Sequence, residues 1–222
     1  MAEKIAEQLD YDEERRDVVA YGLTAILQML TIFILISVIG LLLHIWYESI
    51  CIYLSVGMIR KSTGGAHSKS MGGCILISVL SISCLAIISR YILGFDVSIR
   101  LNVAALCVVF TIAFLVFYLR VPVDNPNKPI VRAEKVKRLR KQSFILLAVF
   151  FCLDLVLILF ADSHTRCYSI AASLRIAMLW QVLTLTKTGI KWLERLDRRM
   201  NELFELFVDP CVKCLRKEGS EK

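Results

Sequence analysis

Long apolar runs alternate with short polar segments along almost the whole chain. About 20 apolar residues in helical form are enough to cross a bilayer. Five runs reach or approach that length: Tyr21–Leu43, Cys74–Leu93, Leu101–Leu119, Phe144–Phe160 and Tyr168–Thr186. A sixth run is shorter and carries a carboxylate, so it is either a short span or a re-entrant segment: Ile45–Ile59. The pattern predicts an all-α, polytopic integral membrane protein.

The polar segments differ in their content of Lys and Arg, and this difference predicts the orientation. Residues 120–141 hold eight basic residues, the tail from Lys187 onward holds nine and residues 60–69 hold three. The turns near Phe95 and Ser163 are poor in basic residues. Because Lys- and Arg-rich connections stay in the cytoplasm, we expect six spans with both termini cytoplasmic, provided that the sixth run crosses.

This reading divides the chain into three parts. Residues 1–20 form a cytoplasmic amphipathic segment, residues 21–186 the transmembrane domain, and residues 187–222 a cytoplasmic helix and tail. In the last part apolar residues recur at three- and four-residue steps, which predicts an amphipathic helix: Leu193, Leu196, Met200, Leu203 and Phe207. This helix lies on the membrane, pairs with a second copy, or packs against the protein's own cytoplasmic loops.

The composition argues against several other functions. The chain is 57% hydrophobic, and most of its eight cysteines lie inside apolar runs, where Cys behaves as a small hydrophobic residue. Cys211 and Cys214 have the two-residue gap of zinc sites, but no second pair or histidine lies near them. We therefore expect no metal and no cofactor. No glycine-rich phosphate loop follows a strand, so we also expect no nucleotide or nucleic-acid partner.

One polar break contains candidate chemistry: RKSTGGAHSKSMGGC, from Arg60 to Cys74. It is either an ordinary flexible loop or a loop that joins a nucleophile, Cys74, to its base, His67. A dyad requires the chain to turn between them, and two glycine pairs, Gly64-Gly65 and Gly72-Gly73, offer the necessary freedom. Cys74 also opens an apolar run, so we expect it at a helix N-terminus, where the helix dipole favours a thiolate.

A second His/Cys pair has the same spacing and serves as an internal control. His44 and Cys51 lack the glycine pairs and lie next to aromatic residues in HIWYESIC. Aromatic residues at the end of a span typically mark the membrane interface. We interpret this second pair as structural.

Two charged residues lie inside the last two apolar runs, at similar depth from the outer turn. Asp154 is six residues from Phe160, and Arg175 is seven from Tyr168. A charge in hydrocarbon is costly unless it is paired. We expect Asp154 and Arg175 to form a structural ion pair, with a place on a substrate path as the alternative.

The residues of the candidate loop resemble a known signature. The stretch Arg60…Gly64-Gly65-Ala66-His67…Cys74 resembles that of the accessory gene regulator protein B family, membrane peptidases that mature quorum-sensing peptides. The segment Pro122–Ile130 resembles that family's second recognisable motif. The size and the six-span arrangement also match, and the departure is small: Ser68 stands where the family often has alanine.

The resemblance implies a function. Cys74 would be the nucleophile and His67 its partner in a cysteine endopeptidase of the cell membrane, in a Gram-positive bacterium, with the active site on the cytoplasmic side. The substrate would be a short pro-peptide with an amphipathic N-terminal helix, an internal cysteine and an acidic C-terminal tail. The enzyme would remove the tail and join the new carboxyl to the internal cysteine as a thiolactone. Family members are thought to act as homodimers.

Substrate contacts are expected around the loop of residues 60–74 and in the basic segment, residues 120–141. The candidates are Arg60, Gly64, Gly65, Gly72, Gly73, Lys128 and Arg132. The basic segment contains three prolines, which favour an extended backbone. It either receives the acidic tail of the pro-peptide or serves only to set the topology.

The main alternative is a small transporter or permease. In that reading the intramembrane charges line a substrate path, and the glycine-rich loop is a hinge. Such proteins commonly contain internal repeats, and no convincing repeat is found here. A receptor or scaffold is a third reading, favoured if the C-terminal helix binds a soluble partner.

Overall fold

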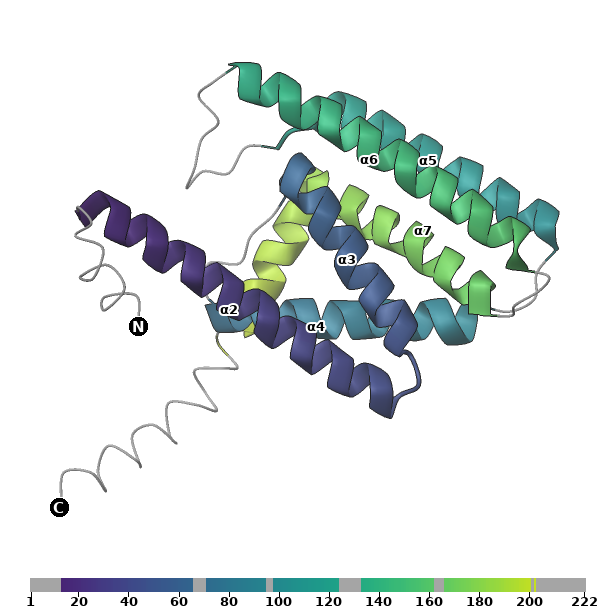
Figure 1. Ribbon diagram of the computed structural model, residues 1–222, viewed down its shortest axis with the longest axis horizontal. Coiled ribbons are helices and arrows are strands. Elements are labelled where there is room, and N and C mark those ends of the chain that lie inside the picture. Colours follow the sequence, from purple (N-terminus) through teal and green to yellow (C-terminus); the bar gives the residue numbers. More distant parts are fainter. Residues whose placement is uncertain are drawn as a thin grey trace.

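The computed structural model describes residues 13–65, 71–94, 98–123, 133–161, 166–200 and 202 (Figure 1). Within these ranges the chain is helical and contains no strand. The helices are α2 (Glu13–Leu42), α3 (Trp46–Thr63), α4 (Met71–Ile87), the π-helical turn η1 (Ile88–Ile92), α5 (Ile99–Arg120), α6 (Ala133–Leu159) and α7 (Arg166–Leu185). A further helix covers residues 187–200 and is called the C-terminal helix below.

Five segments of the described chain are long and apolar enough to cross a membrane. They are Gly22–Leu42, Gly72–Ile92, Ile99–Arg120, Ala133–Leu159 and Arg166–Leu185. The apolar window of the first is only 17% buried within the protein, as expected for a helix that faces lipid, whereas that of the last is 78% buried. The prediction of an all-α, polytopic membrane protein is confirmed.

Helix α7 lies at the centre of the bundle. Figure 1 shows α5 and α6 side by side as one pair, α2 and α4 on the other side, and α3 and α7 between them. One apolar cluster joins α5, α6 and α7 through side chains such as Phe117, Phe150 and Met178. A second joins α2, α3 and α4 through Ile36, Ile52 and Ile82. Helices α3 and α7 contribute to both clusters and so hold the two halves together.

Because α7 is surrounded by protein, it can carry polar side chains that would be costly against lipid. Its buried polar residues are Ser169, Ser173, Arg175, Gln181 and Thr184. Near the start of α7, the Ser169 hydroxyl donates a hydrogen bond of 2.6 Å to Oε1 of Glu48 on α3. The same carboxylate oxygen lies 3.6 Å from Nη1 of Arg90 on η1.

Helix α3 does not qualify as a span by composition, yet it extends from one end of the bundle to the other. Glu48 in its first turn contacts the start of α7, as described above. At its other end the carbonyl of Thr63 accepts a 2.9 Å hydrogen bond from the amide of Val123, just beyond α5. The turn from α2 into α3 contains His44 with φ of 58°. Helix α3 therefore runs back along α2, as a sixth crossing requires.

The two intramembrane charges lie together. Nε of Arg175 is 3.5 Å from Oδ2 of Asp154 on α6, and the Asp154 side chain is fully buried. The guanidinium also donates to Asn102 on α5, at 3.2 Å to the carbonyl and 3.0 Å to Oδ1. The pair and Asn102 thus connect α5, α6 and α7 inside the apolar part of the bundle.

The course of α3 generates a prediction about the topology. In a variant without other cysteines, we expect Lys61→Cys to react with a membrane-impermeant thiol reagent only from the cytoplasmic side. Tyr47→Cys should react only from the outside, because the two exposed positions lie at opposite ends of α3. Labelling of intact cells and of inverted vesicles measures both. Reaction of both cysteines from one side would show that α3 is re-entrant.

The Asp154–Arg175 pair generates a second prediction. Asp154→Arg places two cations together in a buried site, and we expect little folded protein and a clearly lower melting temperature in detergent. Adding Arg175→Asp should restore part of both, because the attraction returns with reversed sign. Arg100→Asp, at an exposed position, is the matched control and should not rescue. Equal recovery with either second change would contradict the pairing.

Candidate functional site

The chain leaves α3 through a tightly held glycine pair. Gly64 has φ of 75° and ψ of −155°, a combination that is essentially restricted to glycine, and Gly65 has φ of 140°. A Cβ on Gly64 would collide with the carbonyl oxygen of Val123. Nε2 of Gln181 donates to Oγ1 of Thr63 at 2.7 Å and to the carbonyl of Gly64 at 3.0 Å. The pair is therefore pinned between α7 and the segment after α5.

The second glycine pair does something different from what we expected. Gly72 and Gly73 do not form a turn: both are helical residues in the first turn of α4. In a helix that begins at Met71, the carbonyls of the first turn accept hydrogen bonds from the next turn, and this outweighs the freedom of glycine. Cys74 follows them in the same turn, so the expectation that it sits at a helix N-terminus is confirmed.

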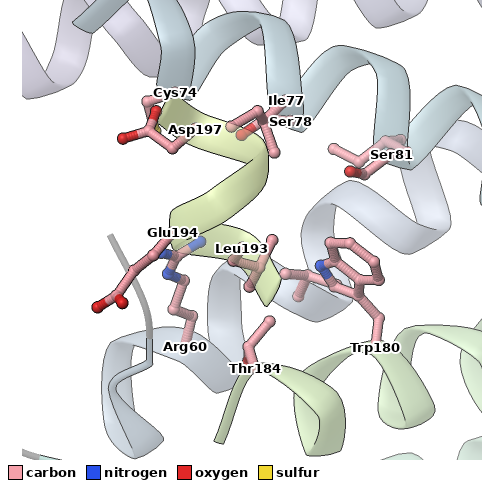
Figure 2. Close-up of a pocket in the computed structure, with 12 residues that line it drawn as sticks. Arg60, Cys74, Ile77, Ser78, Ser81, Trp180, Thr184, Leu193, Glu194 and Asp197 are labelled. Carbon is pink, nitrogen blue, oxygen red and sulfur yellow. The ribbon is translucent and has the colours of Figure 1, made fainter. Parts of the chain in front are cut away.

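Cys74 borders a pocket of about 80 Å³ (Figure 2). Four helices form its walls: α3, α4, α7 and the C-terminal helix. The lining residues are Val56, Arg60, Cys74, Ile77, Ser78, Ser81, Ile82, Trp180, Thr184, Leu193, Glu194 and Asp197. Figure 2 shows Cys74, Arg60, Glu194 and Asp197 toward one end of the pocket, and Trp180 and Ser81 toward the other. A half-buried thiol thus stands at the charged end of a partly apolar cavity.

The structure brings two of the expected site residues together. Arg60, in the last turn of α3, and Cys74 line the same pocket, and the two groups interact electrostatically. A guanidinium is a permanent cation, so it stabilises a thiolate that forms beside it. The control cysteine, Cys51, packs against the apolar core formed by α5, α6 and α7 and does not line this pocket.

Several pocket residues were missed by the sequence analysis. Trp180 and Thr184 lie in the predicted span Tyr168–Thr186 and were not singled out, and Asp197 was not considered. Asp197 is in fact 7% exposed, although its neighbours on either side are exposed or half-buried. The only sequence signal was its position one residue after Leu196, on the apolar side of the predicted amphipathic helix.

Other expected residues fall outside the described ranges. His67 and Ser68 lie in the gap 66–70, and Lys128 and Arg132 lie in the gap 124–132. The second half of the basic segment is described, and it is helical: residues 133–141 form the beginning of α6. Among the described residues, no three His, Cys, Asp or Glu side chains gather as they would around a metal ion.

The conformation of Gly64 generates a prediction about stability. Gly64→Ala forces an L-residue into a strained conformation, which costs about 1–3 kcal/mol, and adds the clash with Val123. We expect a lower melting temperature in detergent and less folded protein. Gly57→Ala, in the middle of α3, is the matched control, since a Cβ there meets nothing within 4 Å. If both variants melt alike, the constraint at Gly64 is absent.

The chain is similar to known proteins over most of its length. The sequence pattern of the family described as Accessory gene regulator B matches residues 1–185. Two AgrB-like proteins from Clostridium perfringens, strains SM101 and 13, are each 28% identical over 205 residues. Each alignment covers 91% of this chain and 96% of the relative. No solved structure matches the chain.

The family match includes the three helices α3, α4 and α7 that form most of the Cys74 pocket, and the curated relatives align over nearly the whole chain. The multi-span helical pattern of the chain is consistent with this match. The chain therefore belongs to the accessory gene regulator B family, which takes part in the processing of quorum-sensing peptides.

Proposed function

We propose that this protein is a membrane-embedded cysteine endopeptidase. It removes the C-terminal tail of a short quorum-sensing pro-peptide through an acyl-enzyme on Cys74 and supports closure of a thiolactone ring. The observation that carries the proposal is the position of Cys74, in the first turn of α4 and at the edge of a pocket that also contains Arg60. Family membership makes a peptide the substrate class.

In the first step the Cys74 thiolate attacks the carbonyl carbon of the scissile bond. The tetrahedral intermediate collapses, the C–N bond breaks, and His67 donates a proton to the departing amine. The tail leaves with a free amino group, and the rest of the pro-peptide stays on Cys74 as a thioester.

In the second step the thiol of the substrate's internal cysteine loses its proton to His67 and attacks the thioester carbonyl. A new thioester forms within the peptide, and Cys74 leaves as a thiolate. One thioester replaces another, so the ring need not be made from a free acid. Holding the internal cysteine against the acyl-enzyme raises its effective concentration, and a site at the edge of a membrane limits competition from water.

The described residues support both steps through charge. The N-terminal end of α4 carries the positive end of the helix dipole, which favours the Cys74 thiolate. Arg60 adds a full positive charge on the facing helix. The backbone around Gly72–Ile75 lies next to the nucleophile and is our candidate for the donors that stabilise the oxyanion.

The remaining parts of the proposal concern binding and placement. Lys128 and Arg132, in the basic segment, attract the acidic tail by charge. The active site faces the cytoplasm, as the basic connections predict. The enzyme works as a homodimer in the cell membrane. One residue of the predicted apolar seam of the C-terminal helix, Leu193, lines the protein's own pocket.

The transporter alternative loses its main support in this arrangement. The charges Asp154 and Arg175 interact with each other, and Arg175 also binds Asn102. Another buried carboxylate, that of Glu48, is paired with Arg90 and Ser169. Both clusters tie helices together, as structural ion pairs inside membranes do.

Co-expression with short pro-peptides that contain an internal cysteine and an acidic tail tests the function. Mass spectrometry of the released tail measures cleavage. We expect Cys74→Ala and His67→Ala each to lower the rate by about four orders of magnitude or more, the loss seen when a nucleophile or its base is removed. Cys51→Ala, the matched control with the same His/Cys spacing, should retain cleavage.

A trapped intermediate gives a second readout. With a substrate whose internal cysteine is replaced by alanine, the thioester on Cys74 should accumulate and should be released by hydroxylamine. Unchanged cleavage by Cys74→Ala would overturn the peptidase assignment. Loss of cleavage in Cys51→Ala alone would place the chemistry at the other pair.

A further inference from the structure

The C-terminal helix is held in a defined position against the membrane domain. The hydroxyl of Thr186 accepts a hydrogen bond of 3.1 Å from the amide of Gly189, and the carbonyl of Thr186 accepts one of 2.9 Å from Ile190. Gly189 is buried, and a Cβ at this position would collide with the carbonyl oxygen of Leu183. The chain therefore turns sharply after α7, and the turn sets the direction of the new helix.

This direction puts one face of the helix against the Cys74 pocket. Leu193, Glu194 and Asp197 line it, opposite residues of α3 and α4. Figure 2 shows Leu193 in the middle of the pocket, between the charged end that holds Cys74 and the end that holds Trp180. The family model matches residues 1–185, so Leu193 lies beyond that match, whereas the curated relatives align over 91% of the chain.

The two ends of the pocket can hold the two parts of one substrate residue, its carbonyl group and its side chain. The reacting carbonyl must lie at Cys74, close to the charged end. A side chain on the same residue then extends toward Trp180, past Leu193 and the apolar residues Val56 and Ile82. An apolar side chain binds in such a pocket because its surface and the apolar walls of the pocket are removed from water.

The volume limits which side chains fit. The pocket measures about 80 Å³, roughly half of the ~150 Å³ that holds a benzene molecule in an engineered apolar cavity. This size favours an aliphatic side chain such as that of Val or Leu over a larger aromatic ring.

We propose that this pocket, closed by Leu193 of the C-terminal helix, is the subsite for the residue whose carbonyl is transferred to Cys74, and that it selects an aliphatic side chain. The inference rests on the proposed peptidase function and adds to it the residue class next to the cleaved bond. Leu193 is a specificity residue in this arrangement, and the C-terminal helix is part of the substrate site.

A panel of pro-peptides that differ only in the residue before the cleaved bond tests this subsite. The full-length protein in membranes is given Ala, Val, Leu, Phe and Trp at that position, and tail release is measured by mass spectrometry. We expect Leu or Val to be cleaved at least about tenfold faster than Ala or Phe, the discrimination typical of an apolar pocket.

Two variants change the pocket in opposite directions. Leu193→Ala enlarges it and should raise the Phe-to-Leu cleavage ratio by about tenfold, whereas Leu193→Phe fills it and should favour Ala. Leu196→Ala is the matched control, because it removes the same atoms from the same helix at a residue that does not line the pocket. Each ratio is taken within one variant, so the amount of folded protein does not affect it.

The outcomes separate the subsite from the function. If all the variants cleave with the same preference as the unaltered protein, the subsite is wrong and the peptidase stands. The subsite is also wrong if Leu196→Ala shifts the preference as much as Leu193→Ala does. If Cys74→Ala still cleaves the panel, the proposed function itself is wrong.

Discussion

The pairing of polar groups along α7 is the constraint on which the rest of the bundle depends. Ser169, Arg175 and Gln181 are buried at the beginning, middle and end of this helix. A polar or charged group in hydrocarbon must find a partner. Ser169 and Gln181 find partners at opposite ends of α3, Glu48 and Thr63, and Arg175 finds Asp154 on α6 and Asn102 on α5. These contacts determine which helices can lie against α7.

One of these contacts, made by Gln181, connects the helix packing to the pocket that contains Cys74. Gln181 binds both Thr63 and the carbonyl of Gly64, so the chain leaves α3 at a fixed point beside α7. Arg60 lies one turn before that point. The same end of the bundle contains the first turn of α4 with Cys74, and the end of α7 with Thr184. A central helix that is polar on several sides therefore assembles the site as well as the fold.

The turn at the end of α7 brings the C-terminal helix against the bundle, where it forms one wall of the pocket. Thr186 and Gly189 redirect the chain, and the C-terminal helix then covers the open side of the pocket. This arrangement buries Asp197 near Cys74 and gives the pocket an apolar wall at Leu193. A pocket made by four helices of distant sequence position can be changed at one wall without changing the residues on the other three.

The sequence by itself determined the membrane-spanning pattern, the position of Cys74 at a helix start and the depth of Asp154 and Arg175. These features follow from local composition and spacing, because bilayer thickness and the cost of buried charge act on each segment separately. Only the tertiary structure decided that Gly72 and Gly73 are helical, that Asn102 joins the ion pair, and that Asp197 and Leu193 face Cys74. Those features depend on which helices pack together and where a chain turns, and residues more than 100 positions apart in sequence meet only in the folded bundle.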